Sequence, residues 1–138
     1  MAEYLKPLPT IQPESEAYWA GCKRHEFLLQ KCRTCGKHQF PHRTICSNCD
    51  SLTTDLEVVK ASGKGTVYTH SAVYRPLSPA FGPDVPYIVV IVDLDEGPRM
   101  MSNMVGCTPD EVKIGAKVEV VFDDVTEEVT LPKFKLAE

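Results

Sequence analysis

The clearest pattern along the chain is a series of short segments of β type in its second half. Val118, Val120 and Phe122 alternate with mainly charged neighbours, as in a strand with one buried face. Residues 87–92 are apolar at every position, which is typical of a strand that is covered on both faces. Strands are therefore expected at residues 26–31, 56–61, 66–75, 87–94, 99–105, 117–123 and 128–134.

A short helix is expected over residues 14–25, ahead of the first strand. Pro13 suits a first helical position, and acidic residues near the start and basic residues near the end complement the helix dipole. Tyr18 and Cys22 lie one turn apart with Trp19 beside them, which gives the helix an apolar face. That face docks either against its own chain or onto a partner.

Turn-forming residues separate the predicted strands. Glycines at 63 and 65 form one turn, and a proline-rich loop occupies residues 76–86. Thr108 and Glu111 have the spacing of a capping box, which predicts a short helical turn. Five or so short strands with one small helical insertion suit a small closed or nearly closed barrel such as an OB-fold. The sequence therefore predicts a mainly β protein.

Four cysteines form the strongest chemical signal, with the spacing C-x2-C, ten residues, C-x2-C. Two such pairs, each on a tight turn, supply the four tetrahedral ligands of a structural zinc ribbon, and four thiolates leave no open position for catalysis. His38 and His42 lie between the pairs and are alternative ligands, and iron or disulfide chemistry has less support. The predicted zinc ligands are Cys32, Cys35, Cys46 and Cys49.

These elements divide the chain into three predicted parts. An N-terminal arm and helix occupy residues 1–25, the zinc ribbon occupies residues 26–52, and the OB-fold domain occupies residues 53–138.

The charge distribution argues against nucleic acid as the partner. The chain of 138 residues has a formal net charge of −4, of which residues 1–50 contribute +2 and residues 51–138 contribute −6. The barrel half therefore lacks the broad positive surface that phosphate-backbone binding needs. The N-terminus does not resemble a signal peptide, and no apolar run reaches the length of a membrane helix, so we expect a cytoplasmic protein.

The remaining titratable residues offer little support for catalysis by the chain alone. Cys22 and Cys107 are expected to be buried structural thiols. A hydrolase or lyase that uses His70 with Cys107 or a carboxylate is an open alternative, but the sequence contains no nucleophile motif.

A family resemblance covers residues 8–136. The chain resembles the acyl-CoA-associated OB-fold proteins with an N-terminal rubredoxin-like zinc ribbon, long catalogued as a domain of unknown function, DUF35. One departure is His42, where the family often has a second proline after Pro41, and this should change a loop only. The matching positions are Tyr18-Trp19, 28–32, Cys35-Gly36, Phe40-Pro41, Cys46, Cys49, Tyr87, Asp93-Leu94, Glu96-Gly97, Arg99 and 114–122.

The resemblance implies an accessory role. Such proteins are partners of thiolase-like, synthase, acyltransferase and hydratase proteins, and they brace the partner and complete or gate a CoA-ester site. It implies a thiolase-like catalytic subunit first, in a complex for which a heterotetramer is expected. An enoyl-CoA hydratase or aldolase-type partner is the alternative, and a single-stranded nucleic-acid-binding module is the second alternative.

Within this interpretation, the sequence offers candidate contacts to a CoA ester. Cationic side chains suit its phosphates, and aromatic rings suit its adenine or acyl group. The loop at residues 76–86 is long enough to act as a lid. The candidates are Lys64, Arg75 and Arg99 among the cations and Tyr74, Phe81 and Tyr87 among the aromatic residues. For each of them an intramolecular ion pair or ordinary packing is the simpler role.

Overall fold

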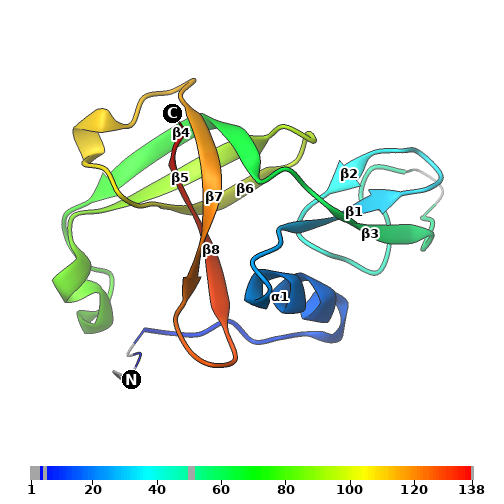
Figure 1. Cartoon of the computed structure of the whole chain (residues 1–138), viewed down its shortest axis with the longest axis horizontal. Helices are drawn as coiled ribbons and strands as arrows, with labels where there is room; N and C mark the ends of the chain where they lie inside the picture. The colour runs from blue at the N-terminus through cyan, green and yellow to red at the C-terminus, as the bar shows by residue number, and fades with distance from the viewer. Residues whose placement is uncertain (1–3, 5, 50–51, 138) are drawn as a thin grey trace.

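The computed structural model describes residues 4, 6–49 and 52–137, which form a small sheet with a helix beside a closed β-barrel (Figure 1). The barrel strands follow the spatial order β4-β5-β6-β8-β7, with β7 pairing back to β4. All neighbours are antiparallel except β6 and β8, which are parallel. The strands are β4 (Lys64–Val73), β5 (Tyr87–Leu94), β6 (Arg99–Met104), β7 (Lys117–Asp124) and β8 (Thr130–Leu136). The predicted mainly β fold with an OB-type barrel is confirmed.

The other sheet of the protein has three antiparallel strands in the order β2-β1-β3. Its strands are β1 (Leu28–Cys32), β2 (His38–Gln39) and β3 (Leu56–Lys60). The strand expected at residues 56–61 is present, but it pairs with β1 along its full length and lies outside the barrel. The two-residue strand β2 was not predicted.

Helix α1 (Glu16–Lys23) lies within the helix expected at residues 14–25, and it follows a 3-10 turn, η1 (Pro13–Ser15), that was not predicted. Two further 3-10 turns, η2 (Pro79–Asp84) and η3 (Pro109–Glu111), interrupt the connections of the barrel. The predicted capping box is present, since the backbone N–H of Thr108 donates to the Glu111 carboxylate at 2.8 Å. None of the helices in the described residues is both long enough and apolar enough to cross a membrane.

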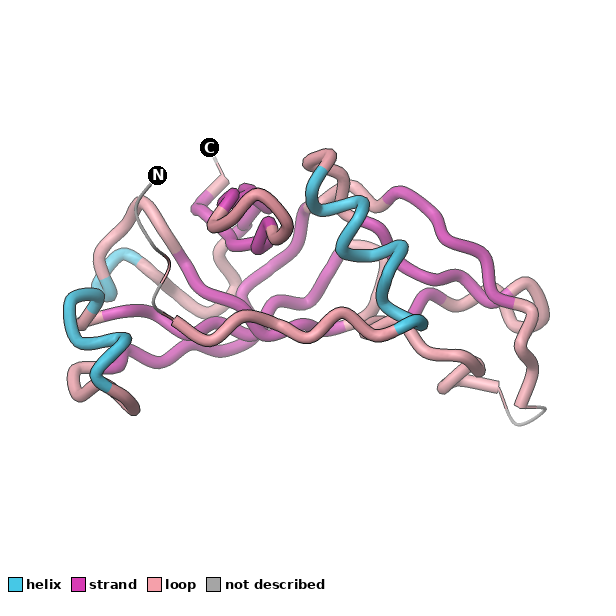
Figure 2. The backbone as a smooth tube through the Cα atoms, turned by 90° about the horizontal axis from the view of Figure 1, so that it is seen from below, coloured by secondary structure: helices cyan, strands magenta, loops and turns pink. Residues whose placement is uncertain are grey.

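The N-terminal arm runs from α1 along one side of the barrel toward η2 (Figure 2). Lys6 in the arm forms an ion pair with Asp84 in η2, and its ammonium group lies 5.9 Å from the centre of the Phe81 ring. Two segments that are far apart in the sequence therefore meet at the end of the barrel opposite the small sheet.

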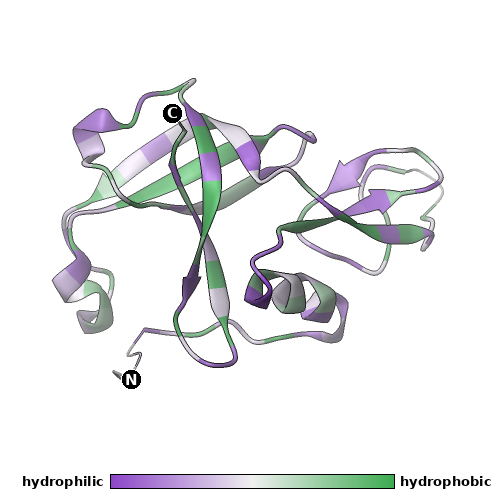
Figure 3. Cartoon of the chain, in the orientation of Figure 1, coloured by the Kyte–Doolittle hydropathy of each residue, from purple (hydrophilic) through white to green (hydrophobic). Residues whose placement is uncertain are grey.

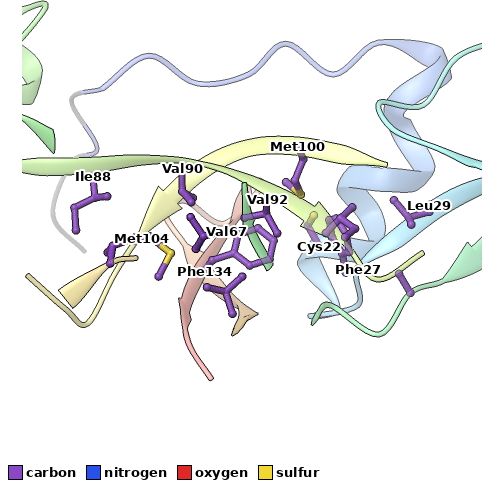
Figure 4. Close-up of a cluster of buried hydrophobic side chains, with 14 of the residues drawn as sticks. Cys22, Phe27, Leu29, Val67, Ile88, Val90, Val92, Met100, Met104 and Phe134 are labelled. Carbon is purple, nitrogen blue, oxygen red and sulfur yellow. The ribbon is translucent and has the colours of Figure 1, made fainter. Parts of the chain in front are cut away.

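One hydrophobic core runs through the barrel and continues under the small sheet (Figure 4). Val90 and Phe134 are fully buried in the barrel, and Cys22 and Leu29 are fully buried at the small sheet. Tyr18 and Cys22 are both buried, so the apolar face of α1 docks on its own chain. The two structures therefore meet through packed apolar side chains.

Strand β5 illustrates how the sequence pattern relates to burial. It is hydrophobic along most of its length (Figure 3). Alternate positions beginning at Ile88 are buried in the barrel, while Val89 and Ile91 on the outer face are only half-buried. The apolar run predicts that this outer face is covered as well, but the described chain covers it only in part.

Candidate metal centre and ligand contacts

The first cysteine pair lies on a turn that begins at the last residue of β1. Cys32 receives a hydrogen bond from the Gly36 N–H at 2.8 Å and donates its own N–H to the Lys37 carbonyl at 3.0 Å. Gly36 adopts a left-handed φ of 77°, which a glycine accepts without strain. The turn directs the backbone N–H of Cys35 toward the Cys32 sulfur at 3.4 Å. Such N–H groups stabilise a thiolate.

The second pair lies in a segment without regular secondary structure. The Cys46 N–H donates to the Thr53 carbonyl at 2.9 Å, and the Asn48 N–H points at the Cys46 sulfur at 3.3 Å. The pattern of one N–H aimed at the first sulfur of each pair therefore repeats at both turns.

The four sulfur atoms have the geometry of one tetrahedral site. All lie within 4.8 Å of one another, with 3.5 Å between Cys32 and Cys49 and 3.7 Å between Cys35 and Cys46. Zn–S bonds of about 2.3 Å in a tetrahedron place the sulfurs about 3.8 Å apart. The residues present therefore fit a zinc ion, as the spacing predicted.

Electrostatics at the site also favour a cation. Loss of hydration at Cys32 opposes ionisation, but hydrogen bonds, led by that from the Cys35 backbone, outweigh it and lower the pKa of the thiol to about 6. The alternative ligand His42 lies elsewhere, with its Nε2 3.0 Å from the Leu28 carbonyl, and burial lowers the pKa of its ring. His38 is absent from the ligand cluster found among the described residues.

Four cysteine ligands close the coordination sphere. A zinc ion held in this way has no position for water or substrate, and it contributes to folding instead of chemistry. The site is therefore structural.

The candidate CoA contacts fall into two groups at opposite ends of β5. Lys64 and Arg99 lie at the end near the small sheet, where the Lys64 carbonyl accepts the Asp95 N–H. Phe81 and Tyr87 lie at the other end, with ring centres 5.7 Å apart, and Tyr74 and Arg75 follow β4 there. The eight residues of β5 span about 23 Å at 3.3 Å per residue, so the six side chains do not line one compact pocket.

Arg99 has two partners within the chain. Its Nε lies 2.5 Å from Asp93, which is opposite it in the β5–β6 ladder, and its guanidinium lies 3.7 Å from the centre of the Tyr68 ring. Aspartate and the ring both stabilise the cation, and the ion pair with Asp93 raises the pKa of Arg99. The turn-forming sequence Asp-Glu-Gly-Pro at residues 95–98 could have identified Asp93 as this partner, because a tight hairpin places the flanking residues opposite each other.

A cleft of about 450 Å³ separates the small sheet from the β5–β6 turn. Arg99 lines it together with Lys37, His38 and Asn48 of the sheet side and Glu96 of the turn. The sequence did not identify these neighbours, because they come together only when the small sheet packs beside the barrel.

Comparison with known proteins identifies both halves. Residues 19–55 match the rubredoxin-like zinc ribbon domain of ChsH2, and residues 58–123 match its C-terminal OB-fold domain. A DUF35 domain-containing scaffold protein of Methanothermobacter thermautotrophicus is 42% identical over 106 residues, which cover 77% of this chain and 78% of that protein. The chain belongs to the DUF35 family.

Longer relatives and a solved structure extend the comparison of this DUF35 protein. A probable enoyl-CoA hydratase alpha subunit of Thermomonospora curvata is 34% identical over 133 residues, which are 96% of this chain but only 40% of that subunit. The structure described as an Ltp2-ChsH2(DUF35) aldolase matches with a TM-score of 0.83 and 32% identity, and the match covers 95% of this chain and 100% of that one.

The remaining thiols of this DUF35 protein do not form a nucleophilic site. Cys22 is buried as expected, and burial raises its pKa to about 11. Cys107 is only half-buried, contrary to expectation, but burial and nearby Glu111 still raise its pKa. Among the described residues, no hydrogen bond joins His70 to Cys107.

Proposed function

We propose that this DUF35 protein is a non-catalytic subunit of an acyl-CoA-processing complex, with a thiolase-type catalytic subunit as its first expected partner. The observation that carries the proposal is the match over nearly the whole chain to a DUF35 chain whose structure is described as part of an aldolase. A benzoylsuccinyl-CoA thiolase subunit of Geobacter metallireducens, 34% identical over 55% of this chain and 48% of that subunit, supports the thiolase type.

An aldolase or enoyl-CoA hydratase partner is the second candidate. The aldolase structure favours the first of these, and the Thermomonospora hydratase alpha subunit favours the second. The hydratase and the thiolase relatives are both named as subunits of enzymes for CoA compounds, so an accessory role suits both candidates.

The chemistry of the chain supports a role without catalysis. Its metal site is closed by four sulfurs, and its two other thiols have raised pKa values, which leave them protonated and poorly nucleophilic. The thiol set also suits a reducing compartment, in keeping with a cytoplasmic location.

An apolar groove offers a place for the partner. It lies between α1 and strands β6 and β8, with a volume of about 270 Å³, and Trp19, Phe40 and Pro132 line it. Met101 also lines it and is 69% exposed, which is high for a large apolar side chain in a strand. The groove is the surface on which we expect the catalytic subunit to dock.

The first experiment purifies the tagged chain from its native cytosol and identifies proteins that accompany it at fixed stoichiometry. A thiolase-like protein supports the proposal, and a hydratase or aldolase supports the second candidate. The chain alone should not turn over acyl-CoA. A chain that purifies without a partner and retards single-stranded nucleic acid in a gel at low salt would contradict the accessory role.

A charge placed in the groove tests the docking surface. Met101→Glu should weaken co-purification of the partner by tenfold or more, because it requires burial of an unpaired carboxylate. Ile114→Glu is the matched control, since Ile114 is similarly exposed at 71% but lies outside the groove. Equal recovery of the partner with both variants would remove the groove from the interface.

The cleft beside the zinc ribbon tests the CoA contact. Arg99→Ala should weaken the affinity of the assembled complex for its CoA ester. Arg75→Ala tests the other candidate group, at the far end of β5, so a comparison of the two variants shows which group contacts the ligand. Isothermal titration of the complex measures both affinities. An unchanged affinity in Arg99→Ala would exclude Arg99 from the site.

A further inference from the structure

Two buried glutamines connect the small sheet to the second cysteine pair. Gln30 of β1 and Gln39 of β2 are cross-strand neighbours, and their exposed fractions are only 8% and 3%. The Gln39 Nε2 donates to the Gln30 Oε1 at 2.7 Å. A buried primary amide requires partners for its oxygen and both of its N–H groups, so the arrangement of these groups is informative.

Gln39 holds both residues that flank Cys46. Its Oε1 accepts the Ser47 N–H at 2.8 Å and the Ser47 hydroxyl at 3.1 Å. Its Nε2 donates to the Ile45 carbonyl at 3.2 Å. Reversal of the amide would place N–H against N–H and oxygen against oxygen, so the neighbours fix its orientation.

Gln30 makes similar hydrogen bonds to the backbone of Arg43, three residues before Cys46. Its Oε1 accepts the Arg43 N–H at 2.7 Å, and its Nε2 donates to the Arg43 carbonyl at 2.8 Å. A side-chain amide thus makes the two contacts to Arg43 that a neighbouring strand would make. The segment from Pro41 to Cys49 has no strand of its own, so these amides supply its backbone with hydrogen-bond partners in place of a neighbouring strand.

We propose that Gln30 and Gln39 are positioning residues for the zinc site and that they preorganise Cys46 before the metal binds. The proposal rests on the four-sulfur cluster and is independent of the partner of the complex. Cys46 is the ligand next to this support, because Gln39 contacts the residues on both sides of it, whereas Cys32 is fixed as the end of β1. Groups around metal ligands commonly change affinity by about 10- to 100-fold when they are lost.

The test compares variants that alter the amide in different ways. Gln39→Met keeps the approximate volume and removes all its hydrogen bonds, and Gln39→Glu keeps the acceptor for Ser47 but removes the donors. Gln30→Met removes the contacts to Arg43 and leaves Gln39 in contact with Ile45 and Ser47. Gln12→Glu, at an exposed position in the arm, controls for added charge.

Zinc affinity is measured by competition with a chromophoric chelator, and zinc release by transfer to an excess of it. We expect both Gln39 variants to bind zinc at least tenfold more weakly and to release it faster, with a smaller effect in Gln30→Met and none in Gln12→Glu. The visible spectrum of the cobalt-substituted protein should show a distorted sulfur tetrahedron in the Gln39 variants.

A purely structural role gives a different result. It would lower the free energy of unfolding of the Gln39 variants. The rate of zinc release from the folded fraction would then stay within twofold of the wild-type rate, and its cobalt spectrum would be unchanged. That outcome overturns the proposal. Should Gln39→Met not accumulate as folded protein, Gln39→Glu and Gln30→Met still decide it, because each retains part of the network.

Discussion

The zinc ribbon and the barrel are stabilised by different means, although they share one core. Four described residues with polar or charged side chains are buried, and three of them, Gln30, Gln39 and His42, belong to the ribbon. The barrel interior is filled instead by apolar side chains such as Val90, Val92 and Phe134. The ribbon therefore depends on directional contacts, and the barrel depends on packing.

Size explains this difference. A module of about 30 residues cannot bury enough apolar surface to offset the entropy of ordering its chain, so it requires a metal or another cross-link. A closed five-stranded barrel satisfies its backbone through strand pairing and packs an interior at the same time. The two parts should accordingly respond to different perturbations.

The largest effect is expected from removal of the metal. Structural zinc contributes an apparent binding free energy of about 10–16 kcal/mol to small zinc domains, so chelation or Cys46→Ser should unfold the ribbon. Amide hydrogen exchange should show loss of protection in β1 and β3 and retention in β5. If β5 loses protection as well, the shared core makes ribbon and barrel one cooperative unit, and the contrast between them fails.

The next largest effect is expected from a cavity in the barrel core, which is the counterpart of removing the metal from the ribbon. Phe134 is fully buried and pairs with Met104 at the only register position that joins β6 to β8 among the described residues. Phe134→Ala should lower the free energy of unfolding by about 3–5 kcal/mol, since it leaves a large cavity. Urea denaturation measures the loss, and Phe81→Ala in the partly exposed η2 turn is the control. Zinc affinity should remain unchanged, and a parallel loss of zinc would contradict separate stabilisation.

The sequence predicted those features that depend on local pattern. A helix within residues 14–25, the strand at 87–94, the capping box at Thr108 and the cluster of four cysteines follow from periodicity, cap chemistry and spacing, and all are present. Each signal involves residues that are close in the chain, so no knowledge of tertiary packing was needed.

Features that depend on packing were not predicted. The pattern of residues 56–61 identifies a strand but contains nothing that distinguishes pairing with β1 from pairing with β4. Gln30 and Gln39 have no local signal, because an amide becomes informative only when its partners are known. The candidate CoA contacts were chosen by residue type, and a search by type alone cannot show that they lie at two ends of β5.

A smaller effect is expected where the barrel backbone approaches itself closely. A Cβ on Gly65 would lie 2.6 Å from the Asp93 carbonyl oxygen and 2.5 Å from a methyl group of Val92. Gly65→Ala should therefore cost about 1–3 kcal/mol through forced movement of β4 against β5. Gly82→Ala is the matched control, because a Cβ there has no neighbour within 4 Å. Thermal unfolding compares the two, and equal midpoints would show that the barrel absorbs the methyl group.

The smallest effect concerns the junction between the two parts. His25 follows α1 with a left-handed φ of 62°, and its N–H and that of Glu26 close the helix end on Cys22 and Gly21. The His25 ring stacks on Phe122 of β7 at 5.2 Å, and its Nε2 lies 3.0 Å from both oxygens of Asp124. A helix cap of the ribbon side thus also contacts the barrel.

Two substitutions at His25 separate these roles. Asparagine tolerates the left-handed conformation and loses the ring, whereas valine loses the ring and strains the backbone by about 1–2 kcal/mol. His25→Val should therefore unfold more readily than His25→Asn in urea, and equal stability would show that the helix end relaxes.

The same pair of variants responds to pH through Asp124. The Thr130 hydroxyl and then His25 lower the pKa of the Asp124 carboxyl. A lowered pKa in the folded state contributes stability above the unfolded value, and this contribution is lost as pH falls below about 4. The stability difference between the wild type and His25→Asn should therefore shrink in acid, while the backbone strain that separates His25→Val from His25→Asn should not. Backbone strain does not depend on protonation. Stability measured over a pH series therefore distinguishes the two roles of His25, which are its contact with the barrel and its place at the end of the helix.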